Sequence, residues 1–257
     1  MRASTSRPFD RRRRPAVSNL TELGSPGSRY RHFLIDLDRE ARVFADEVSN
    51  LLNHTVTDGI RLSAVIAPHD KTKVLLVGNR LTKHNFVPEA IPLTISARRP
   101  VGYLYAAYVL AADPEETYLA VVKSQYGLYA EDGLEGMVVH WDYEREPSHQ
   151  YPAAHVQVNG ECSHFDELTD RSRNAGRECP HRPLRDLHLP VGGRRFRPTL
   201  EDVVEFLIAE GFVDSRPGAL EVVQQHREIW EDRQLRAAVR RNPETALRQL
   251  REDGHIA

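Results

Sequence analysis

The fold is decided by residues 102–144, which read GYLYAAYVLAADPEETYLAVVKSQYGLYAEDGLEGMVVHWDYE. Three extended apolar segments follow one another here, and they are residues 102–111, 117–128 and 137–143. Turn-forming residues separate them at Asp113-Pro114-Glu115 and at Asp132-Gly133. Because short turns join neighbouring antiparallel strands, the spacing predicts an antiparallel meander. A fourth strand is expected at residues 153–158.

Segments on both sides of the meander are expected to cover its apolar face. Residues 30–53 carry apolar side chains at spacings of three and four, which predicts an amphipathic helix. A second helix is expected to begin at Thr199, with Asp202 at its third position in a variant of the capping box. Its expected buried stripe consists of Leu200, Val203, Phe206 and Leu207. With two further strands expected at residues 60–66 and 73–77, the chain is expected to be α+β, with a sheet of five or six strands.

The ends of the chain and one long insertion define its expected organisation. Residues 1–29 hold seven arginines and two acidic residues and lack a hydrophobic period, which predicts a disordered basic arm. Residues 30–212 are expected to form the α+β domain, with an irregular insertion at residues 159–198 that is rich in Gly, Pro, Arg and Asp. Residues 213–257 are expected to form a helical appendage. The basic arm is either a solvated tail or a nucleic-acid-binding arm.

Composition narrows the function classes. The 257 residues include 35 basic and 37 acidic side chains, so a net charge of −2 gives no electrostatic reason to expect a DNA-coating protein. Two cysteines exclude a disulfide scaffold. The longest apolar stretch, residues 103–112, is about half the length of a membrane-spanning helix. We therefore expect a cytoplasmic protein without a membrane partner.

The last strand of the meander, the fourth strand and the loop between them carry the candidate catalytic residues His140, Asp142, His149 and His155 and the candidate substrate-binding residue Gln157. Because strand side chains alternate, His140 and Asp142 share one face of their strand, and His155 and Gln157 share one face of the next. Pairing the apolar faces of the two strands would place these four side chains side by side. His149, in the connecting loop, could fold over the same patch.

Imidazoles beside a carboxylate are suited to general acid–base catalysis, because histidine titrates near neutral pH and a carboxylate can hold it in one tautomer. The same ligands would also suit a divalent metal ion. The third interpretation is that these are ordinary polar residues on a solvated strand face. Ser124 is a further candidate, as a hydroxyl donor to the substrate or as an ordinary strand residue.

Several of these residues together resemble a known family. The pattern comprises Trp141-Asp142, His149, Pro152, His155 and the helix that begins Thr199-Leu200-Glu201-Asp202. It resembles the TumE-type toxins of bacterial toxin–antitoxin systems, over residues 100–160 and 199–211. The chain departs from the family pattern at Tyr143, where the family has Asn, and at Gln157, where it has a second His. Pro152 also lies one residue further from His155 than the family pattern has it.

The resemblance implies a growth-inhibiting toxin-like domain that is masked by an antitoxin or another neighbouring partner. The chemistry of the candidate residues further suggests that the protein is a ribonuclease-like phosphodiesterase, which cleaves RNA or a nucleotide. Two other classes stay open: a non-catalytic adaptor that docks a partner through its C-terminal helices, and a metal-dependent hydrolase.

The insertion holds two further candidate sites. Both cysteines occur in a Cys-x-His arrangement, so Cys162, His164, Cys179 and His181 are candidate ligands of a structural zinc ion, or else unrelated loop residues. Arg194 and Arg195 follow two glycines and could hold a phosphate of the substrate. The alternative for this arginine segment is a flexible lead-in to the next helix.

Overall fold

The structure is a computed structural model, and it describes residues 35–67, 74–95, 99–147, 151–174, 184, 187–192 and 197–256. The chain divides into two compact units, Met1–Phe33 and Leu34–Ala257, of which the first lies outside the described residues. The predicted basic arm at residues 1–29 therefore lies outside them as well.

An antiparallel sheet of eight strands is the main element of the described residues, which confirms the α+β fold class. The strands are β1 (Leu62–Ala67), β2 (Val74–Asn79), β3 (Ile91–Pro92), β4 (Tyr103–Ala112), β5 (Leu119–Tyr129), β6 (Met137–Glu144), β7 (Ala154–Val158) and β8 (Leu189–Pro190). Their order in the sheet is β1-β2-β4-β5-β6-β7-β8, and β3 pairs with β4 beside this path. The meander appears as β4 to β6. The two-residue strands β3 and β8 exceed the expected number because they are too short to show an apolar alternation.

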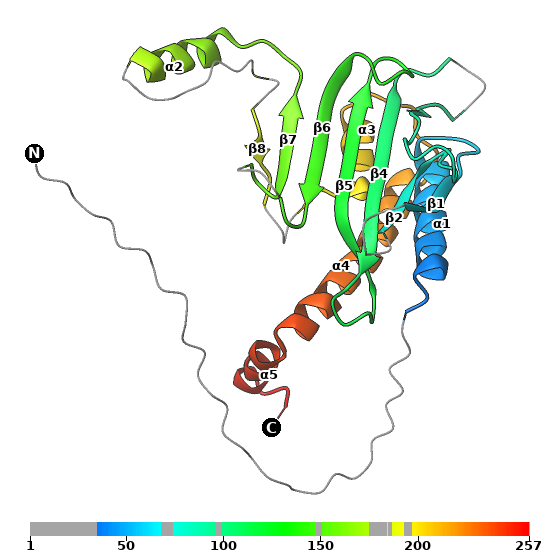
Figure 1. Ribbon diagram of the computed structural model, residues 1–257, viewed down its shortest axis with the longest axis vertical. Helices are drawn as coiled ribbons and strands as arrows, with labels where there is room; N and C mark the ends of the chain where they lie inside the picture. The colour runs from blue at the N-terminus through cyan, green and yellow to red at the C-terminus, as the bar shows by residue number, and fades with distance from the viewer. Residues whose placement is uncertain are drawn as a thin grey trace, which may run out of the picture. The chain divides into compact units, whose positions relative to one another are not determined.

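One face of the sheet is covered by helices. The described residues form the helices α1 (Leu37–Thr55), α2 (Ser163–Asn174), α3 (Leu200–Ala209), α4 (Ala219–Arg241) and α5 (Pro243–Glu252), of which α1, α3 and the beginning of α4 pack on the sheet. Figure 1 shows α3 and the beginning of α4 behind β4 to β6, with no helix in front of these strands. Along β4, the buried residues Leu104, Ala106, Tyr108 and Leu110 alternate with partly exposed ones. The covered face therefore forms the core, and we call the other side the open face.

Helix α3 begins as its sequence predicts. The side chain of Thr199 accepts a hydrogen bond from the backbone N–H of Asp202, and the Asp202 carboxylate accepts one from the backbone N–H of Thr199. This reciprocal capping box satisfies two donors at the start of the helix. The buried stripe differs at one position, because Val204 is buried and Phe206 is 36% exposed. Phe206 packs edge-to-face on Trp141 instead, at the rim of the core.

Part of the helical appendage expected at residues 213–257 packs against the rest of the unit. Ala219 and Val223 of α4 are buried, and Arg233 binds Glu47 of α1 through two hydrogen bonds of 2.6 and 2.7 Å. The N-terminal part of α4 therefore belongs to the core of the unit. The last helix differs, because α5 has no buried residue.

The insertion at residues 159–198 is not wholly irregular. It contains α2, a polar helix in which Arg171 pairs with Glu167 one turn earlier, at 3.0 Å. An apolar stripe is the signal by which helices are recognised in sequence, and the sequence of this helix, SHFDELTDRSRN, has too few apolar residues to form one. The expectation of an entirely irregular insertion is therefore wrong for Ser163–Asn174.

Candidate functional site

Strands β6 and β7 bring four of the candidate side chains together on the open face. In their antiparallel pairing, His140 lies opposite Gln157 and Asp142 lies opposite His155. This is the register that apolar-on-apolar pairing predicts, because Val139, Trp141 and Tyr143 lie on the other face, towards the helices. We refer to His140, Asp142, His155 and Gln157 as the histidine cluster.

His140 is held through one nitrogen, and its other nitrogen has no hydrogen-bond partner among the described residues. Its Nε2–H donates to Oε1 of Gln157 at 2.6 Å, and the same nitrogen lies 3.4 Å from Oδ2 of Asp142. With the proton held on Nε2, the lone pair of the neutral ring is on Nδ1. The side chain of His140 is 23% exposed, so a substrate can reach it. Gln157 thus positions the imidazole.

His155 approaches the same carboxylate from the next strand. Its Nδ1–H donates to the backbone carbonyl of Pro152 at 3.0 Å, and its Nε2 lies 3.6 Å from Oδ2 of Asp142. The side chain is only 4% exposed. Tyr151 and His188 pack on it, with ring centroids 5.1 and 4.6 Å from the His155 ring, and stack on each other. Two imidazoles therefore converge on one carboxylate oxygen, one accessible and one buried.

Burial lowers the pKa of His155 below its ordinary value of 6.5. The Pro152 carbonyl and the Asp142 carboxylate act in the opposite direction, whereas His188 and His140 add to the lowering. At neutral pH the His155 ring is therefore neutral. Its Nε2 lone pair can accept a proton beside a carboxylate that offsets the positive charge thus formed.

This shift predicts a loss of stability in mild acid. Below about pH 6.5 the unfolded chain binds a proton on His155 that the folded chain resists, so the free energy of unfolding should fall as the pH decreases. The slope from one such group is at most about 1.4 kcal/mol per pH unit. In His155→Gln the dependence should be flatter between pH 7 and 5, as measured by urea unfolding. The matched control is His164→Gln, whose side chain is 88% exposed and whose profile should follow that of the unaltered chain.

Two tyrosines extend the site towards β4 and were not identified from the sequence. A Cβ atom at Gly127 would lie 2.5 Å from Cε2 of Tyr129, so the tyrosine ring lies across this glycine, next to His140 in the register. Burial, together with the Asp142 carboxylate, raises the pKa of Tyr129. Burial, Tyr129 and Asp142 likewise raise the pKa of Tyr105. Both phenols thus stay protonated. The sequence signal for this pair is Gly127, because a glycine inside an aromatic-rich strand indicates that another group packs closely over it.

Ser124 does not belong to this site. It pairs with Tyr143 on the helix-covered face, is 1% exposed and accepts a hydrogen bond from Arg197 at 3.4 Å. Its neighbour Gln125 is the residue opposite Asp142. The expectation that Ser124 donates to the substrate is therefore wrong, because adjacent strand residues point to opposite faces.

Several candidate residues lie outside the described residues: His149, Cys179, His181, Arg194 and Arg195. Of the zinc candidates, the structure describes Cys162, a free thiol, and His164, which lies on the surface of α2 beside Glu167. Within the described ranges, no group of three or more His, Cys, Asp or Glu side chains is placed to hold a metal ion.

Comparisons with protein-family models, with curated proteins and with solved structures find no match to this chain. Among the helices that the structure describes, none combines the length and the apolar character needed to cross a membrane.

Proposed function

We propose that the histidine cluster cleaves RNA or a nucleotide by general acid–base chemistry, as the effector of a toxin–antitoxin type system. One observation carries the proposal: Nε2 of His140 and Nε2 of His155 lie 3.4 and 3.6 Å from the same oxygen of Asp142, on a sheet face that Figure 1 shows without a covering helix. Enzymes that move two protons in one reaction place two titratable groups in different environments. The partly exposed imidazole of His140 and the buried imidazole of His155 meet this requirement.

The two imidazoles suit different roles in phosphodiester transfer. His155, neutral through burial, would accept the proton of the ribose 2′-hydroxyl as O2′ attacks phosphorus. His140, in the imidazolium form with its Nε2–H held by Gln157 beside Asp142, would donate the proton on Nδ1 to the 5′-oxygen as the P–O5′ bond breaks. The products would be a 2′,3′-cyclic phosphate and a free 5′-hydroxyl, with no water consumed. Asp142 would offset the charge of whichever ring is protonated.

The test uses the purified full chain and a single-stranded RNA oligonucleotide. We expect fragments that end in a 2′,3′-cyclic phosphate and a 5′-hydroxyl, identified by mass spectrometry. An oligonucleotide with a 2′-deoxyribose at the cleavage position should stay intact, because it lacks the attacking hydroxyl. Cleavage of the deoxy oligonucleotide, or 3′-hydroxyl ends, would refute the 2′-hydroxyl mechanism.

A second candidate function, a partner-docking adaptor, is favoured by the end of the chain. Helix α5 has no buried residue, and its Leu247 and Leu250 are 44% and 40% exposed. On α4, Leu235 and Val239 are 65% and 45% exposed. Exposed apolar side chains of this kind suit docking to another protein. An adaptor would lose its growth effect on removal of residues 243–257 and keep it in His140→Ala, whereas the ribonuclease proposal requires His140.

A further inference from the structure

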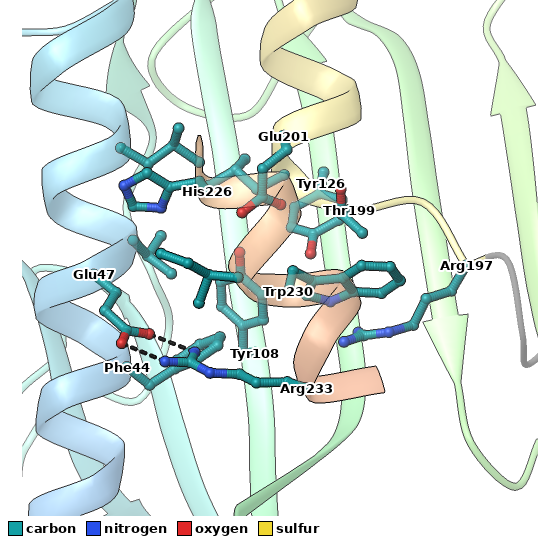
Figure 2. Close-up of a pocket in the computed structure, with 14 residues that line it drawn as sticks. Phe44, Glu47, Tyr108, Tyr126, Arg197, Thr199, Glu201, His226, Trp230 and Arg233 are labelled. Carbon is teal, nitrogen blue, oxygen red and sulfur yellow. Dashed lines mark hydrogen bonds and ion pairs between the residues drawn. The ribbon is translucent and has the colours of Figure 1, made fainter. Parts of the chain in front are cut away.

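A cavity of about 90 Å³ lies on the covered side of the sheet, between β4, β5 and the helices α1, α3 and α4. Figure 2 shows its polar lining, which includes Arg197, Arg233, Glu47, Glu201, Tyr108 and Tyr126. Liquid water occupies about 30 Å³ per molecule, so the cavity has room for a group the size of a carboxylate or a phosphate. It lies on the opposite face of the sheet from the histidine cluster.

Arg197 is the unusual member of this lining. The residue is 9% exposed, and within the described ranges its guanidinium makes one hydrogen bond, of 3.4 Å, to Oγ of Ser124. The group stacks on Tyr143 and Trp230, with its Cζ 4.9 and 5.8 Å from the ring centroids, and Figure 2 shows it pointing towards Trp230. Within the part of the chain that the structure describes, no carboxylate oxygen lies within 4 Å of it. A buried charge normally has an ionic partner, and Arg197 has none among the described residues.

None of the other described groups that line the cavity acts as the ionic partner of Arg197. Arg233 is already bound to Glu47 through both of its terminal nitrogens. Burial raises the pKa of Tyr108 and of Tyr126, so both phenols stay neutral and do not compete for an anion's place. Glu201 is the one lining carboxylate without an ion pair among the described residues, and it would repel an anion. An anion at Arg197 would therefore be partly opposed by Glu201, and this opposition can be measured.

We propose that this cavity binds a small oxyanion, a carboxylate or a phosphate, with Arg197 as its ionic partner. The guanidinium offers planar N–H pairs that match two oxygens of either group. The proposal is independent of the ribonuclease proposal, because no residue of the cavity belongs to the histidine cluster.

The test is titration of the full chain with sodium phosphate and with sodium acetate, at constant ionic strength adjusted with sodium chloride. We expect a saturable rise in Tm and a calorimetric binding signal for at least one of the two anions. A response to phosphate alone assigns a phosphate ligand, and a response to acetate assigns a carboxylate. Because phosphate would also bind a ribonuclease site, both titrations are repeated in His140→Ala, where the signal from the cavity should persist.

Variants separate a binding site from a structural arginine. Arg197→Met should abolish the response, and Arg236→Met, which removes a surface guanidinium that is 68% exposed, should leave it unchanged. Glu201→Gln should tighten binding by roughly two- to tenfold, because a like charge is removed. This second variant keeps the test decisive if Arg197→Met fails to fold. No saturable response to either anion, an unchanged affinity in Glu201→Gln, or an equal loss in Arg236→Met would overturn the proposal and leave Arg197 as a clamp between Tyr143 and Trp230.

Discussion

Replacing His140 by alanine is expected to lower the rate of RNA cleavage by about 10²- to 10⁴-fold, which is the usual cost of losing a principal acid–base group. His140 has the larger exposed fraction of the two imidazoles, 23% of its side chain against 4% for His155. Its Nδ1 is also the nitrogen that its hydrogen bond to Gln157 leaves open. Single-turnover cleavage of the RNA oligonucleotide measures the effect on the chemical step directly.

The same substitution should leave the chain folded. His140 is partly exposed and its loss removes one side-chain hydrogen bond, which costs about 1 kcal/mol of unfolding free energy. His164→Ala is the matched control, since that side chain is 88% exposed on α2 and should retain full activity. Undiminished cleavage by a folded His140→Ala protein would remove the imidazole from the mechanism and favour the adaptor function.

The part of the site that was predictable from the sequence is the part that depends on strand alternation alone. His140, Asp142, His155 and Gln157 lie on one face because strand side chains repeat every two residues and the apolar residues between them face the core. The same rule excludes Ser124 from the site despite its hydroxyl, because Ser124 pairs with Tyr143 and its neighbour Gln125 pairs with Asp142. The period-two pattern therefore decides which residues can meet, and chemistry alone does not.

The part that was not predictable depends on contacts between distant segments. His188 reaches the His155 ring from the insertion, through the two-residue pairing of β8 with β7, which no periodicity indicates. Arg197 stacks on Trp230 of α4, a contact that exists only once α4 has packed on the sheet. Local propensity also could not reveal α2, because its sequence SHFDELTDRSRN has two apolar residues, too few to form an apolar stripe.

Asp142→Asn is expected to reduce cleavage by about 10²- to 10⁴-fold as well, although the substituted side chain keeps its size. Oδ2 of Asp142 lies beside Nε2 of both imidazoles, so its charge stabilises the protonated form of each ring in turn. An amide has no negative charge, so it cannot stabilise the protonated form of either ring in this way. If both rings act through this carboxylate, Asp142→Asn combined with His140→Ala should be little worse than either change alone.

A readout other than activity distinguishes this electrostatic role from a loss of structure. The Asp142 carboxylate partly offsets the lowering of the His155 pKa by burial, and it contributes to the raised pKa of Tyr129. In Asp142→Asn both groups should therefore titrate at lower pH than in the unaltered chain. Histidine ring NMR shifts and tyrosinate absorbance follow the two titrations. Glu144→Gln is the matched control, because Glu144 lies on the same strand and face and accepts from Tyr151 at 3.0 Å, a bond that the amide oxygen of Gln can keep. Equal loss of activity in Glu144→Gln, or unchanged titrations in Asp142→Asn, would mean that the carboxylate oxygen shared by the two rings is not the centre of the chemistry.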